Sequence, residues 1–157
     1  MTARDPQLAL RFEVAPKPAA RWRTGAALAY LGGPITLQLD TDRKQAALDG
    51  TVLHLPLPPD VTARQVQDAA EAWQRREAGR VLKAVAARLT AAIGQSMPAL
   101  TLSFAARSGW IQDETDVLRC NWHLIEQPMS IIEQVLARAI AAMPQSNRND
   151  DLFTAFA

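Results

Sequence analysis

Residues 121–153 read NWHLIEQPMSIIEQVLARAIAAMPQSNRNDDLF, and this stretch decides the fold. An Asn-Trp pair and a proline turn lead into one amphipathic segment. Ser130 and Glu133 have the spacing of a capping box, in which two side chains satisfy backbone N–H groups at a helix start. Six apolar residues then recur on one helical face: Ile132, Val135, Leu136, Ala139, Ile140 and Met143. We therefore predict a helix over residues 130–143, limited by Pro144.

A second and longer helix is predicted over residues 62–93. Thr62 and Gln65 make another capping-box pair, and apolar residues follow near the helical period: Val66, Ala69, Ala70, Trp73, Val81, Val85, Leu89 and Ile93. Gly94 is placed to end this helix in a left-handed conformation. Gly79 lies inside the pattern and costs about 1 kcal/mol relative to alanine, so we expect a close packing contact or a bend there.

The rest of the chain alternates with a period of two, which predicts β-strands. These strands cover residues 8–14, 35–39, 52–57, 100–104 and 118–124. Residues 15–20 form a proline-containing connector, residues 107–116 a polar connection, and Asp49-Gly50 a hairpin turn before the strand at 52–57. Strands, a long helix, more strands and a last helix predict an α+β fold. A length of 157 residues fits one domain.

Composition narrows the class of protein. Hydrophobic residues make up 48% and charged residues 21%, which indicates a globular chain. The net charge of +1 supplies no electrostatic case for a nucleic acid or an anionic membrane as partner. No apolar run approaches the roughly 20 residues of a membrane span, and the N-terminus lacks the apolar stretch of a signal peptide. We therefore expect a cytoplasmic protein, and the single Cys120 cannot form an internal disulfide.

Two apolar faces define the expected core. Trp73 on the long helix and Trp122 on the late strand should be buried, together with Val135 and Ile140 of the last helix.

From residue 30 onward, the order of motifs resembles that of the YgjP/SprT-like minimal zincins, a family of zinc metallopeptidases. YLGGPITLQL, the Asp-Gly turn and VLHLPLPPDVT look like the leading β-region of that family. Arg107 and Gly109 look like remnants of its Arg-Trp-Gly-Ser-Cys stretch. NWHLI at 121–125 matches the family's NWRLI, with His123 in place of arginine. The resemblance implies a zincin-like domain with an N-terminal β-region, one long helix, a mixed or antiparallel sheet and a C-terminal active-site helix.

In that family the last helix carries His-Glu-x-x-His, and a third histidine follows. Two histidines at i and i+4 reach one metal from the same helix face, and the glutamate acts as general base on the bound water. An ungapped alignment places Arg138 and Ala142 at the two histidines, Ala139 at the glutamate and Arg148 at the third ligand. Alanine has no donor atom, and arginine repels a dication. We therefore predict no metal ligand, no catalytic residue and no bound cofactor where the family would hold zinc.

Other candidate residues favour structural roles. Cys120 and His123 are three apart on a predicted strand, so they should point to opposite faces and not chelate one metal. We expect Cys120 to be buried, and His123 and His54 to be exposed. The acidic cluster at 113–116 lacks the ligand count of a calcium loop, which favours a solvated turn.

Arg107, Arg138 and Arg148 remain as a possible cleft for an anion or an acidic peptide, because guanidinium groups pair well with carboxylates. Alternatively, Arg138 pairs with Glu133 or Glu126, or extends into water.

The sequence thus favours a catalytically inactive zincin-like domain retained as a binding or scaffold module, with an unidentified protein or acidic peptide as partner. An alternative is a metal-dependent hydrolase whose site is completed in a way not visible in the sequence, for example by another chain. A third is a gene product without a selected function.

Overall fold

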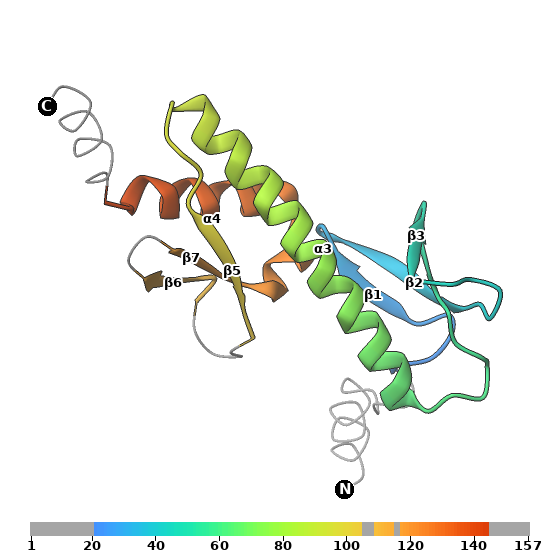
Figure 1. Cartoon of the computed structure of the whole chain (residues 1–157). Helices are drawn as coiled ribbons and strands as arrows, with labels where there is room; N and C mark the ends of the chain where they lie inside the picture. Colours follow the sequence, from blue (N-terminus) through green and yellow to red (C-terminus); the bar gives the residue numbers. More distant parts are fainter. Residues whose placement is uncertain (1–20, 105–108, 115–116, 145–157) are drawn as a thin grey trace, which may run out of the picture. The chain divides into compact units, whose positions relative to one another are not determined.

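The computed structural model describes residues 21–104, 109–114 and 117–144, which form an α+β fold of helices and strands (Figure 1). The predicted strand at 8–14 and connector at 15–20 lie outside these residues. The chain forms two compact units: the first consists of Met1–Ala29 and Pro34–Trp73, and the second of Tyr30–Gly33 and Gln74–Ala157. The prediction of one zincin-like domain over residues 1–157 stays a prediction.

The first unit is built on a sheet with the strand order β1-β2-β4-β3. Its strands are β1 (Ala27–Tyr30), β2 (Gly33–Leu39), β3 (Ala47–Asp49) and β4 (Val52–Leu55). The β3–β4 hairpin turns at Gly50, where φ is +61°, which confirms the predicted Asp-Gly turn. β2 pairs in parallel with β4, and Leu37 faces Leu53 in that register, both fully buried. The strand β1 was not predicted, because its four residues show no clear alternation.

Helix α3 (Ala63–Ala92) begins and ends where the sequence predicts. Thr62 and Gln65 exchange hydrogen bonds between side chain and backbone, at 3.2 Å from Gln65 N to Thr62 Oγ1 and 3.0 Å from Thr62 N to Gln65 Oε1. This confirms the capping box. At the other end Gly94 has a φ of +69°, and Gly94 and Gln95 donate their N–H groups to carbonyls of the last turn. That pair of bonds is a Schellman motif, which ends the helix.

The second unit contains a sheet with the strand order β5-β7-β6. β5 (Ala99–Ser103) runs parallel to β7 (Val117–Asn121), and β6 (Ile111–Glu114) runs antiparallel to it. The predicted polar connection at 107–116 is therefore wrong in part, because pairing with β7 gives strand geometry to a segment that lacks apolar alternation. Phe104, expected on the same face as Leu100, lies beyond the end of β5 and is 61% exposed.

The chain leaves β7 through a short 3-10 helix, η1 (Trp122–Glu126). The side chain of Asn121 caps this helix by accepting a hydrogen bond from the His123 backbone N–H at 3.0 Å. The strand predicted over 118–124 therefore ends at residue 121, because the cap turns the backbone out of the ladder.

Helix α4 (Met129–Ala142) corresponds to the helix predicted over 130–143. Pro128 holds the N-cap position, and no side chain caps the helix there. The predicted capping box is therefore wrong: Glu133 instead lies 2.6 Å from the guanidinium of Arg88 on α3.

The core of the second unit joins residues of α3, β5, β7, η1 and α4. Its fully or nearly fully buried residues on α4 are Ile132, Leu136 and Ile140, here called the α4 stripe. Trp122 is 5% exposed, and Trp73 in the first unit is also 5% exposed, so both predictions of burial are confirmed. Ile140 is buried as expected, whereas Val135 is only partly buried at the edge of this core.

The turn between β1 and β2 is attached to η1 by backbone hydrogen bonds. Leu31 N donates to Ile125 O at 2.8 Å, and Gly32 N donates to Glu126 O at 2.9 Å. Gly32 has a φ of +84°, and a Cβ added there would lie 2.8 Å from Pro128 Cγ. Glycine is thus required by both conformation and space.

Within the described ranges, no helix combines the length and the hydropathy that a membrane crossing needs.

Two glycine substitutions should have opposite effects on stability. Within the described residues, a Cβ at Gly79 meets only Leu102 Cδ1, at an ordinary contact distance of 4.0 Å. Gly79→Ala should therefore raise the free energy of unfolding by about 0.5–1 kcal/mol. Gly32→Ala should lower it by about 2–4 kcal/mol, since it combines left-handed strain with a clash. Urea unfolding measures both, and a stabilising Gly32→Ala would contradict the described turn.

Candidate functional site

The outward face of α4 is determined by the stripe that it buries. Since Ile132, Leu136 and Ile140 point into the core, residues 138 and 142 point the other way. Arg138 and Ala142 are both exposed and lie one turn apart on the same face, whereas Ala139 packs partly against the core. The helix therefore presents the two positions aligned with family histidines together, as an arginine and an alanine.

Arg138 has no carboxylate partner among the described residues. The two acidic residues considered for it are engaged elsewhere: Glu133 pairs with Arg88, and Glu126 lies 2.6 Å from His123 Nδ1. Arg138 is exposed on the helix surface. Arg107 and Arg148 lie outside the described residues, so a cleft formed by the three arginines stays a prediction.

His123 and Cys120 have separate environments. The His123 ring stacks on Trp122 with 3.8 Å between centroids, and its side chain is 43% exposed. Cys120 is fully buried, and burial raises the pKa of its thiol to about 12. A thiol with such a pKa stays protonated and is a poor nucleophile at neutral pH. Across the described residues, no group of three or more His, Cys, Asp or Glu side chains could hold a metal ion.

Tyr30, Glu77 and Arg80 form a polar cluster between the end of β1 and α3. The Tyr30 hydroxyl donates to Glu77 Oε2 at 2.7 Å, and Arg80 donates to both oxygens of the same carboxylate, at 3.0 and 2.7 Å. The Arg80 hydrogen bond lowers the pKa of Glu77. Burial, with the bond to Glu77, raises the pKa of Tyr30 to about 12. The mutual satisfaction of these groups indicates a structural tie.

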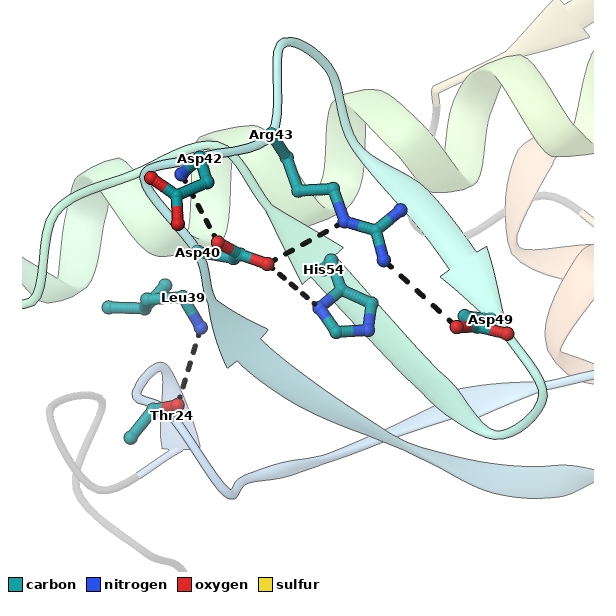
Figure 2. Close-up of polar contacts among 7 residues, drawn as sticks. All are labelled: Thr24, Leu39, Asp40, Asp42, Arg43, Asp49 and His54. Atoms are coloured by element: carbon teal, nitrogen blue, oxygen red, sulfur yellow. Dashed lines mark hydrogen bonds and ion pairs between the residues drawn. The ribbon is translucent and has the colours of Figure 1, made fainter.

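A second polar cluster lies on the first unit, where Asp40 is the centre (Figure 2). Asp40 Oδ2 is 3.5 Å from His54 Nδ1 and 3.6 Å from Arg43 Nε, and Arg43 reaches Asp49 at 4.0 Å. The His54 side chain is only 13% exposed, so the expectation of an exposed His54 is wrong. In the register of the sheet, Gln38 of β2 and Ala47 of β3 lie on either side of His54, and the Asp40 carboxylate lies beside its ring. Arg43 places a positive charge beside this carboxylate and disfavours a cation there.

A family model for the YgjP-like metallopeptidase domain matches residues 7–137 of the chain. The chain belongs to the YgjP-like family. No curated protein and no solved structure matches it significantly. The match ends one residue before Arg138, so it covers the scaffold and most of α4 but none of the four positions aligned with zinc ligands and base.

YgjP-like domains are zinc metallopeptidases, and the described part of α4 does not fit a zinc ion. Ala142 offers no donor atom, and Arg138 carries a permanent positive charge at the neighbouring position. No His, Cys, Asp or Glu on the described outward face of α4 replaces them.

Sequence reasoning missed a cluster centred on Arg75. Its guanidinium lies 5.7 Å from the ring centroid of Phe104 and 5.7 Å from that of Trp122. In the sequence, Arg75 reads as one of two adjacent surface arginines, and no local signal indicates that two aromatic residues converge on it.

The stability contributed by Glu77 should depend on pH. Because its pKa is lowered from 4.5 in the folded state, the carboxylate stabilises the fold above that pH and loses this effect as the pH falls below it. Glu77→Gln should cost about 1–2 kcal/mol near neutral pH, and the difference from the unmodified protein should shrink in acid. Urea unfolding across this range is the measurement.

The matched control is Glu71→Gln on the same helix, whose carboxylate meets the amide of Gln67 and no arginine among the described residues. Glu71→Gln should lower the free energy of unfolding by less than Glu77→Gln does, and this loss should change little as the pH falls. Equal pH profiles for the two variants would contradict the role given to Glu77.

Proposed function

We propose that this chain is a YgjP-like domain without peptidase activity, retained as a binding or scaffold module. The proposal is supported by one observation: the exposed face of the helix α4 carries Arg138 and Ala142, at the two positions that the resemblance aligns with the family's histidines. A zincin needs two imidazoles there, with a carboxylate at position 139.

The arrangement of the rest of the unit supports retention of a scaffold. The α4 stripe is buried, α3 is capped at both ends, and the turn at Gly32 is held by backbone bonds. A folded domain that has lost its ligands still presents a surface, and its function then depends on that surface and not on the family chemistry.

Zinc content tests the proposal directly. Untagged protein, incubated with zinc and desalted, should contain far less than one zinc per chain by elemental analysis, because the described helix offers no ligand pair. It should also leave unstructured peptides uncleaved, as measured by mass spectrometry. One tightly held zinc per chain, or zinc-dependent cleavage, would favour the metal-dependent hydrolase instead.

Restoring histidines should create a metal site if α4 has kept the family geometry. Arg138→His with Ala142→His places two imidazoles on one exposed face, so zinc should raise the melting temperature by binding the folded state. The control pair Ala137→His with Ala142→His has the same histidine content at a spacing of five, which turns the rings apart. It should respond less to zinc in differential scanning fluorimetry.

Adding Ala139→Glu and Arg148→His to the first pair tests the full alignment. The four-fold variant should bind zinc more tightly than the two-histidine variant, since a third ligand completes a zincin-type set. Hydrolysis need not return, because the surrounding shell also tunes the metal. If the four-fold variant folds but binds zinc no more tightly than the two-histidine variant, position 148 does not correspond to the third ligand.

A further inference from the structure

The Arg75 cluster, made of Arg75, Phe104, Trp122 and His123, joins α3 to the end of β5 and to η1. The guanidinium of Arg75 is equidistant from two ring centroids, at 5.7 Å from each. Trp122 is buried and carries the stacked His123 ring beside it. Two aromatic faces thus hold the cation at a defined place, since a positive charge is attracted to the face of an aromatic ring.

The charge of Arg75 is not neutralised by a carboxylate within the described residues. Glu77 is two residues away on α3, but both of its oxygens accept hydrogen bonds from Arg80. Glu126, the acidic residue of η1, pairs with His123. Arg43, Arg64, Arg80 and Arg88 each pair with a carboxylate. Arg75 instead lies over two aromatic rings, Phe104 and Trp122.

Phe104 adds an apolar surface beside this charge. It is 61% exposed, the highest exposed fraction among the large hydrophobic side chains of the described residues. Exposing the apolar surface of such a ring to water is unfavourable, and a ligand that packs on the ring removes part of that surface from water. A free guanidinium and an exposed aromatic ring in contact match a ligand with a carboxylate next to an apolar group.

We propose that the Arg75 cluster binds a peptide in which an aspartate or glutamate adjoins an aromatic residue. The peptide carboxylate pairs with Arg75, and the aromatic side chain packs on the exposed face of Phe104. This inference rests on the proposed function, for which it names the binding surface and the chemistry of the partner.

Charge favours a peptide over a single-stranded nucleic acid. A nucleic acid gains affinity from several cations along a groove, whereas the described cluster holds one arginine without a carboxylate partner. The net charge of +1 adds no general attraction for phosphates. A single carboxylate needs only the one guanidinium.

The test is an NMR titration of the full chain, labelled with nitrogen-15, with the synthetic peptide Gly-Ser-Asp-Phe-Gly-Ser. We expect shifts of the Arg75 Nε–H and the Trp122 indole N–H signals. Replacing Asp by Asn or Phe by Ser in the peptide should weaken binding several-fold. Arg75→Gln should raise the Kd about tenfold, because it removes one charge-assisted pair of hydrogen bonds to the peptide carboxylate.

The matched control is Arg76→Gln, which removes an exposed arginine adjacent in sequence and should change the Kd less than twofold. Phe104→Ala should raise the Kd several-fold, and Phe104→Tyr should retain binding. If Arg75→Gln does not fold, Arg75→Lys replaces it and should still bind more weakly, because lysine lacks the planar fork.

Absence of binding at millimolar peptide, or equal effects of Arg75→Gln and Arg76→Gln, would overturn the inference. Stronger binding of oligo-dT than of the peptide at the same salt would overturn it in favour of a nucleic acid. Mass spectrometry of the recovered peptide and zinc analysis of the same sample separate the two proposals. If the peptide is cleaved and the protein contains zinc, the proposal of an inactive domain is refuted. If the protein contains no zinc and does not bind the peptide, only the proposed peptide site is refuted.

Discussion

Burial of the α4 stripe is the constraint on which the second unit depends. Ile132, Leu136 and Ile140 recur every four residues and are almost completely removed from water. Burial of three such side chains contributes several kcal/mol to the free energy of folding. A rotation of the helix about its axis would expose them to water and lose this contribution. Their burial orients α4, and with it the outward positions 138 and 142, independently of what side chains those positions carry. The orientation of α4 therefore does not depend on whether these two positions carry metal ligands.

The polar clusters differ in how far the charge of each side chain is balanced by hydrogen-bond donors or an opposite charge within the cluster. Glu77 is bonded to both Tyr30 and Arg80, and Asp40 lies between His54 and Arg43, so each carboxylate is opposed by donors or a cation. Compensated clusters stabilise a fold and leave little charge for a ligand. Arg75 differs because aromatic rings hold it in place while leaving its charge available. This contrast, and not exposure alone, is the reason for proposing the Arg75 cluster as a binding surface.

Family membership and function rest on different parts of this chain. The family match extends to residue 137 and so includes the described sheet strands, α3 and residues 129–137 of α4. These parts are maintained by packing, which tolerates changes on a solvent-facing side. Metal chemistry instead depends on a few exposed atoms, and Arg138 and Ala142 do not supply them. A shared scaffold is therefore compatible with a changed activity.

The sequence by itself determined the elements whose signals are local. The capping box at Thr62, the left-handed Gly94 and the apolar periods of α3 and α4 were predicted to within one residue, because each depends on neighbours along the chain. Only the tertiary structure decided the strand β6, the parallel pairing of β2 with β4, the cover over His54 and the exposure of Phe104. These depend on contacts between distant residues, for which the sequence carries no local period. The Arg75 cluster belongs to the same class, since Arg75, Phe104 and Trp122 come from three separate segments of the chain and meet only after folding.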